Sequence, residues 1–142
     1  MAATTFEGKV AEVLMARVAA IPGSVPAAYP NRDFRPPMDS NGEPLAYMDV
    51  AHLPNGTAFE TLGASGAIHQ GILQIAVMQP EGGGAVKPQD TAGAIVEHFA
   101  KNTVLYGDGL NVKIYSRPTV GQSFPGDSYI RTPVTIQYIA SA

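Results

Sequence analysis

The chain has 142 residues, of which 45% are hydrophobic and 15% charged, and its net charge at pH 7 is −3. This length favours one domain spanning residues 1–142, which can bury a sufficient core without disulfides or metals. The nine basic residues are scattered singly, so the clustered Lys and Arg that grip nucleic acid are absent. A chain this poor in charge must cover apolar surface, and self-assembly is one way to do so.

The absence of cysteine excludes disulfides, thiolate nucleophiles and Cys-ligated metals, and it fits a protein made in a reducing cytosol. The first nine residues lack a basic stretch followed by an apolar run, so no secretory signal is predicted. No apolar run approaches the ~20 residues of a membrane span, so no membrane partner is expected.

The first predicted element is an amphipathic helix over residues 4–20. Thr4 or Thr5, followed by Glu7, can cap its N-terminus, and Pro22-Gly23 ends it. Its apolar residues recur at helical spacing on one stripe, which predicts a buried face. The members of this stripe are Phe6, Val10, Val13, Leu14 and Val18.

Three strands, with loops between them, are predicted between residues 25 and 78. Residues 25–31 contain two prolines and predict a short edge strand, and residues 33–44 form a loop. Residues 45–53 predict a strand that is closed by a turn at Pro54-Asn55-Gly56. Residues 67–78 give the clearest strand, because their apolar side chains alternate between two faces. Together these strands predict a long hairpin, extended beyond the body of the protein.

A second helix is predicted over residues 88–101, after the glycine-rich break at 80–84. Pro88 suits its first turn, with Asp90 near the positive end and Lys101 near the negative end. Its apolar stripe consists of Ala92, Ile95, Val96 and Phe99. Residues 104–106 and 110–115 then flank Gly107-Asp108-Gly109, a typical sequence for a tight hairpin.

The last segments are a loop over residues 117–127 and a strand over 128–139. Pro133 predicts that this strand lies at an edge of the sheet or is bulged there. Hairpin-type links dominate the order of elements. The fold class is therefore α+β, with a mainly antiparallel or mixed sheet and two helices packed on one face.

Catalytic chemistry is not indicated by any motif. His52 and His69 lie on neighbouring predicted strands and would need a third ligand, for which Glu60 is the nearest candidate. Gly82-Gly83-Gly84 precedes a helix but lacks the Gly-Lys-Ser/Thr of a phosphate-binding loop. No catalytic residue, cofactor or metal is therefore predicted. A small metal- or ligand-binding enzyme using His52 and His69 remains the alternative from a different functional class.

Two loops and a charged aromatic segment are the candidate contact sites with a neighbouring subunit or another protein. The connection over residues 54–66 is the first candidate, the loop over 117–127 the second, and residues 32–35 the third, because Arg and aromatics are enriched at interfaces. The alternative for each aromatic or aliphatic side chain is that it caps the protein's own core. The candidate residues are Phe59, Leu62, Phe124, Phe34 and Arg35.

Short motifs along almost the whole chain resemble one known family. They are Ile21-Pro22-Gly23, Ala28-Tyr29-Pro30-Asn31, Phe34-Arg35-Pro36-Pro37, Tyr47, Thr61-Leu62-Gly63, Gly71-Ile72-Leu73-Gln74-Ile75, Pro80-Glu81-Gly82, Ala94-Ile95, Phe99, Gly109-Leu110-Asn111-Val112, Arg117-Pro118, Tyr129-Ile130 and Pro133-Val134. In this order and spacing the chain resembles the tail-terminator-like proteins of long-tailed phages and related prophage elements.

The resemblance implies a structural virion protein. Such a protein forms a six-fold ring at the head-proximal end of the tail tube, stops tube polymerisation and joins the tail to the head connector. The implied partners are further copies of the chain, the tail tube protein and a connector or stopper protein, with DNA only as passing cargo. The implied location is the tail–neck junction, after assembly in the host cytoplasm. Another neck or tail-completion subunit is the alternative within the same class.

Overall fold

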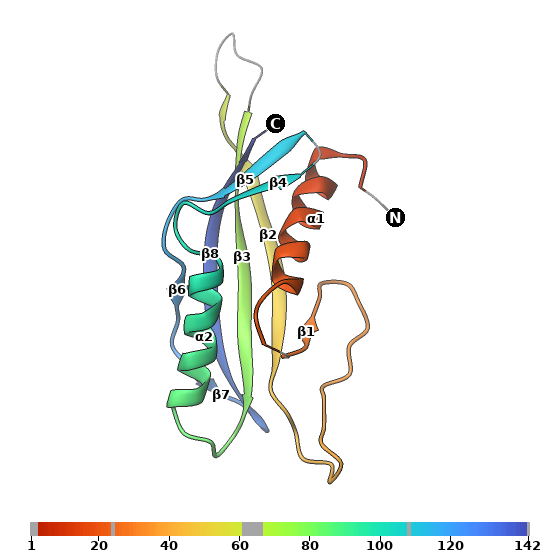
Figure 1. The fold of residues 1–142 in the computed structure, drawn as a ribbon, viewed down its shortest axis with the longest axis vertical. Coiled ribbons are helices and arrows are strands. Elements are labelled where there is room, and N and C mark those ends of the chain that lie inside the picture. Colours follow the sequence, from red (N-terminus) through yellow and green to blue (C-terminus); the bar gives the residue numbers. More distant parts are fainter. Residues whose placement is uncertain (1–2, 24, 61–66, 108, 142) are drawn as a thin grey trace.

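The computed structural model describes residues 3–23, 25–60, 67–107 and 109–141, and for residues 55–60, 67 and 68 it describes the main chain alone. Two helices pack on one side of a long sheet (Figure 1). In chain order the elements are α1 (Phe6–Ala19), β1 (Ala27–Ala28), β2 (Tyr47–Glu60), β3 (Ala67–Pro80), α2 (Val86–His98), β4 (Val104–Gly107), β5 (Leu110–Ile114), β6 (Thr119–Val120), β7 (Phe124–Pro125) and β8 (Tyr129–Ser141).

The sheet has the strand order β1-β2-β3-β8-β5-β4, and β6 and β7 also pair with β8. All of these pairs are antiparallel except β1 with β2. Both helices cover the same face, and the buried residues of helices and strands form a core cluster between them. The predicted α+β fold with a mixed, mainly antiparallel sheet is therefore confirmed.

Helix α1 begins at Phe6, directly after its N-cap residue Thr5. The Thr5 side-chain oxygen accepts a hydrogen bond from the Gly8 amide at 3.1 Å, and a capping oxygen satisfies an amide that has no partner within the helix. Val10, Leu14 and Val18 are buried, while the rest of the predicted stripe packs against them. The predicted helix is confirmed, with bounds one or two residues shorter at each end.

Helix α2 is displaced towards the N-terminus relative to its prediction. It begins at Val86, so Asp90 lies beyond the first turn, and it ends at His98, so Lys101 lies in the following turn. The placement of these two charges at the helix ends was therefore wrong. The reason is the C-terminal turn, where the Phe99 amide donates to the Ile95 carbonyl and Asn102 adopts a left-handed φ of 73°. The predicted apolar stripe is buried throughout.

The predicted turn at Pro54-Asn55-Gly56 does not exist, because β2 continues to Glu60. The Met48 amide donates to the Pro26 carbonyl, so Met48 directs its main-chain groups towards β1 at the outer edge of β2. Main-chain direction alternates along a strand, which places the nitrogen of Pro54 on this same edge. The missing amide hydrogen therefore removes no bond to β3, as for other edge prolines.

Pro133 also departs from its prediction, because β8 is central in the sheet and lies between β3 and the β5–β7 strands. The Pro133 carbonyl accepts from the Gly121 amide at 2.7 Å, so the proline nitrogen also faces that side. On that side of β8, Pro133 lies opposite the gap between β6 and β7. No main-chain amide of residue 133 is therefore needed for strand pairing. The predicted loop over residues 117–127 thus contains two short strands along β8.

The C-terminal ends of the two helices are joined by a reciprocal pair of hydrogen bonds. The Arg17 guanidinium donates to the His98 carbonyl at 2.7 Å, and His98 Nε2 donates to the Arg17 carbonyl at 2.8 Å. Burial lowers the pKa of His98 and is the largest effect. The hydrogen bond to the Arg17 carbonyl raises this pKa, and the nearby Arg17 charge lowers it. The neutral imidazole is thus the form that fits this junction.

We predict that Thr5→Ala lowers the free energy of unfolding by about 1 kcal/mol, because it removes the N-cap acceptor of α1. Thr4→Ala is the matched control, since Thr4 is exposed and lies outside the helix. Urea denaturation followed by circular dichroism measures both. Equal effects of the two substitutions would contradict the assignment of the cap to Thr5.

We also predict that the protein loses stability as the pH falls from 7 to 5. Burial lowers the pKa of His52 and of His98, so the unfolded chain takes up protons at a higher pH than the folded chain. The stabilisation is present above the ordinary histidine range and is lost as the pH falls through it. His98→Gln, which retains a donor for the Arg17 carbonyl but does not titrate, should make this slope shallower. Urea denaturation at several pH values measures how the free energy of unfolding changes with pH in both proteins. The same pH dependence in His98→Gln and in the wild type would contradict the role of His98.

Candidate assembly surface

Neither helix covers the opposite face of the sheet (Figure 1). In register across four strands, this face carries a row formed by Phe124 of β7, Arg131 of β8, Met78 of β3 and Tyr47 of β2. Residues opposite one another in paired strands direct their side chains to the same face, so this row is continuous. We call this side of β2, β3 and β8, together with Phe124, the open face.

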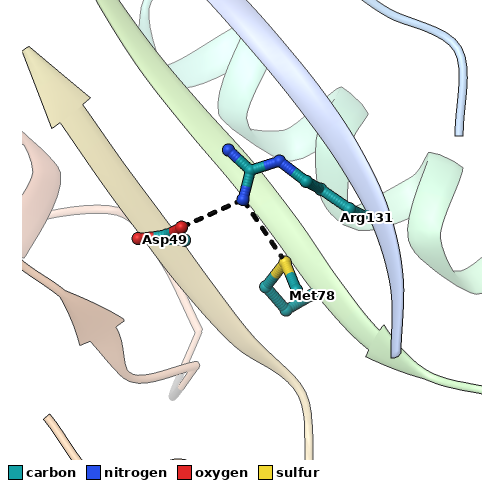
Figure 2. A network of polar contacts seen from close by, with 3 residues as sticks. All are labelled: Asp49, Met78 and Arg131. Carbon is teal, nitrogen blue, oxygen red and sulfur yellow. Dashed lines mark hydrogen bonds and ion pairs between the residues drawn. The ribbon is translucent and has the colours of Figure 1, made fainter. Parts of the chain in front are cut away.

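Among the side chains that the structure describes on its three long strands, the open face holds one ion pair. The Arg131 guanidinium donates to an Asp49 carboxylate oxygen at 2.9 Å and lies 3.8 Å from the Met78 sulfur (Figure 2). The two charged side chains are 36% and 46% exposed, so water screens the pair and its contribution to stability is under about 1 kcal/mol. From Tyr47 to Leu53, and along the described parts of β3 and β8, no other charged side chain alternates onto this face.

An aromatic cluster lies at one end of the open face. Phe34 packs on Tyr47 with ring centroids 5.1 Å apart, and Tyr47 meets Tyr129 edge-on at 5.2 Å. Burial raises the pKa of Tyr47, and the neighbouring Asp49 charge raises it further. Phe34 is therefore half-buried against its own chain, whereas the adjacent Arg35 is exposed.

The candidate contact residues are divided between the two ends of β2. Phe34, Arg35 and Phe124 belong to segments near its start, and Phe124 is 54% exposed. Phe59 lies near its other end, paired in register with Ile68, while Leu62 lies outside the described residues. A strand rises about 3.3 Å per residue, so the ends of this 14-residue strand lie roughly 40 Å apart. The described ends of β2 and β3 project beyond α1 and the C-terminus (Figure 1), and we call this projection the arm.

The two histidines considered for metal binding have other contacts. His52 Nε2 lies 2.5 Å from the Tyr138 hydroxyl, and the His69 ring lies 4.5 Å from the Phe6 ring. Burial lowers the pKa of His52 and raises the pKa of Tyr138 to about 12. Within the described part of the chain, no three His, Asp or Glu side chains are grouped as metal ligands require. The Glu60 side chain is not among those described.

Sequence reasoning missed Tyr47, Asp49, Met78 and Arg131 as members of one surface. Their alternation placed each on a strand face, but the pairing register that joins them depends on contacts between residues as far as 82 positions apart.

In residues 3–23, 25–60, 67–107 and 109–141, no helix is long and apolar enough to cross a membrane.

The fold and this surface define a class of protein: a small α+β protein whose sheet is covered by helices on one face only and whose central hairpin extends from the body. The family model described as phage tail terminator protein matches residues 9–138. The chain belongs to the phage tail terminator family, which is structural, and it is a structural component of phage tail completion.

Comparison with solved structures supports the same fold. One solved chain superposes with a TM-score of 0.65 and 24% sequence identity, over 95% of this chain and 89% of the other. At this identity the similarity concerns the fold alone. No protein with curated function matches the chain.

We predict that the Asp49–Arg131 pair contributes a coupling free energy of about 0.2–1 kcal/mol to folding, because both groups are partly solvated. A double-mutant cycle with Asp49→Ala and Arg131→Ala, measured by urea denaturation, tests this value. The matched control combines Asp49→Ala with Lys87→Ala, a distant exposed cation on α2, and should give no coupling. A coupling of several kcal/mol would mean that the pair is buried far more deeply than the open face allows.

Proposed function

We propose that the protein forms a ring that caps the head-proximal end of the phage tail tube. The ring ends tube polymerisation and joins the tail to the head connector. Membership of the terminator family supports this proposal, since it places the chain in tail completion. The open face is the structural observation that carries it.

The open face has the chemistry of a surface that another protein covers. Charged residues are depleted at the centre of protein interfaces. Among the described side chains of this face, the charged ones are a mutually neutralised pair, and the rest are uncharged. Leu53 and Phe124, at 53% and 54% exposure, add apolar area to it. Contact between this surface and a different surface of the next copy is heterologous, which closes a ring when the rotation is right.

The arm is our second proposed contact, made with the tail tube protein or with a neighbouring copy. Beyond Pro54 the outer edge of β2 has no β1 partner, and exposed strand edges pair readily with other chains. Phe59 and Leu62 belong to this segment by sequence. Phe124 and Arg35, at the opposite end of β2, would then serve a separate contact, with Phe34 holding their end of the face in place.

We further propose that the ring lies at the tail–neck junction, has six subunits and lets DNA pass through its lumen as cargo. The scattered basic residues and net charge of −3 support passage without gripping, because phosphate binding requires clustered Lys and Arg. A head connector or stopper protein is the partner on the other side. We propose no enzymatic activity, since His52 and His69 are engaged with Tyr138 and Phe6.

We predict that native mass spectrometry of the purified chain mixed with tail tube subunits detects rings and capped tubes. Phe124→Asp should raise the concentration needed for ring formation at least tenfold, because it buries a charge in the proposed contact. Its melting temperature should match the wild type, since Phe124 lies outside the core. A chain that remains monomeric and leaves tubes uncapped would overturn the proposal.

The matched control for this experiment is Val86→Asp, which places the same charge on an 81% exposed side chain at the start of α2. Helix α2, which begins at this residue, lies on the side of the sheet opposite the open face (Figure 1). Equal loss of ring formation in both variants would show that the open face is not the contact surface of the ring. Capping of the other end of the tube, or binding to the neck alone, would support the alternative of another tail-completion subunit.

A further inference from the structure

We propose that Tyr138, His52 and Gly71 form a brace beneath α1 that sets the direction of the arm. In this proposal Tyr138 and His52 are positioning residues, which act on a partner through the arm and do not touch it. The importance of the arm rests on the proposed function, but the brace itself is a property of the folded chain and can be measured without a partner.

The pairing of β2 with β3 changes character at the brace. From Tyr47 to Pro54 each residue of β2 is matched by one residue of β3, ending with Pro54 opposite Gly71. The next matched pairs are Thr57 with His69 and Phe59 with Ile68, so β2 has one extra residue in each of two consecutive steps. Such bulges bend a hairpin and increase its twist. We infer that the direction of the arm beyond them depends on the side chains that hold its base.

Tyr138 supplies the first of these side chains. It is paired in register with Gly71, is 2% exposed, and its ring lies directly over the Gly71 main chain. A Cβ atom added to Gly71 would collide with the Tyr138 hydroxyl and ring carbons. Glycine is therefore required here for close approach of the ring, and not for its backbone angles. The ring crosses β3 at the last regular pair before the bulges.

His52 completes the connection across three strands. Tyr138 belongs to β8, passes over β3 at Gly71, and its hydroxyl lies 2.5 Å from Nε2 of His52 on β2. The rings of Tyr138 and His52 lie 5.7 Å apart between centroids. The hydroxyl retains its proton, since burial raises the pKa of Tyr138 to about 12, and burial also favours neutral His52. One hydrogen bond therefore ties β8 to β2 two residues before Pro54.

Helix α1 lies over the brace on the core side of the sheet, and its first two turns line a cavity with His52 and Tyr138. Phe6, in its first turn, lies 4.5 Å from the His69 ring on the other side of Gly71. A cavity of about 180 Å³ remains between α1 and the base of the arm, and His52, His69, Tyr138, Phe6, Pro54 and Gln70 are among the residues that line it. Since the cavity borders both arm strands, loss of the Tyr138–His52 bond leaves the base room to shift.

The experiment measures the direction of the arm in the full chain. The sequence has no cysteine, so Glu60→Cys at the end of β2 and Glu97→Cys on the exposed side of α2 can be spin-labelled selectively. We expect a narrow distribution of distances between the labels. Tyr138→Phe, which removes only the hydroxyl, should at least double its width, and His52→Ala should do the same. Tyr106→Phe is the matched control, because it removes the hydroxyl of a 79% exposed tyrosine on β4, and it should leave the width unchanged.

Gly71→Ala is the stronger variant and should shift the mean distance as well, because the methyl group displaces the Tyr138 ring. Melting temperatures identify variants that do not fold, and the conclusion then rests on Tyr138→Phe. Unchanged distributions in folded Tyr138→Phe and His52→Ala would overturn the brace.

Tube capping by the same variants distinguishes this inference from the proposed function. A broadened arm together with wild-type capping would support the brace and show that the arm is not the tube contact. An unchanged distribution together with lost capping would overturn the brace while leaving the arm as a contact.

Discussion

The antiparallel pairing of β3 with β8 is the constraint on which the rest of the structure depends. Leu73, Ile75 and Val77 on one strand and Val134 and Ile136 on the other are completely buried on the helix side. Because side chains alternate with a period of two, this register commits one whole face of both strands to the core. A slip by one residue would place the amides and charges of the open face beneath the helices.

That commitment leaves the opposite face of the sheet for the assembly contacts proposed above. Both helices pack on one face of the sheet, and the other face is open to water or to another protein. The titratable groups of the open face contact one another: Asp49 pairs with Arg131, and Tyr47 packs on Tyr129. The ion pair is partly solvated. The polar groups that do approach one another closely, His52 with Tyr138 and Arg17 with His98, join structural elements beneath and between the helices.

Two of the places where sequence reasoning failed are prolines, and both failed for one physical reason. A proline removes a main-chain donor, so Pro54 predicted a turn and Pro133 an edge or bulge. Both lie inside long strands, because each nitrogen faces the side where no ladder bond is available. Sequence shows that the donor is missing but not the direction in which it would have pointed. That direction depends on which strand is the neighbour.

The sequence by itself determined the two helices, the long hairpin, the pairing of β4 with β5 and the α+β class, because these depend on periodicity and on residues close together in the chain. It also carried the family resemblance. Only the tertiary structure decided which residues share the open face and that Gly71 is needed for the passage of Tyr138. Both facts depend on the pairing register of β2, β3 and β8. This register arises from the burial of one face shared by the three strands, so local sequence preferences do not specify it.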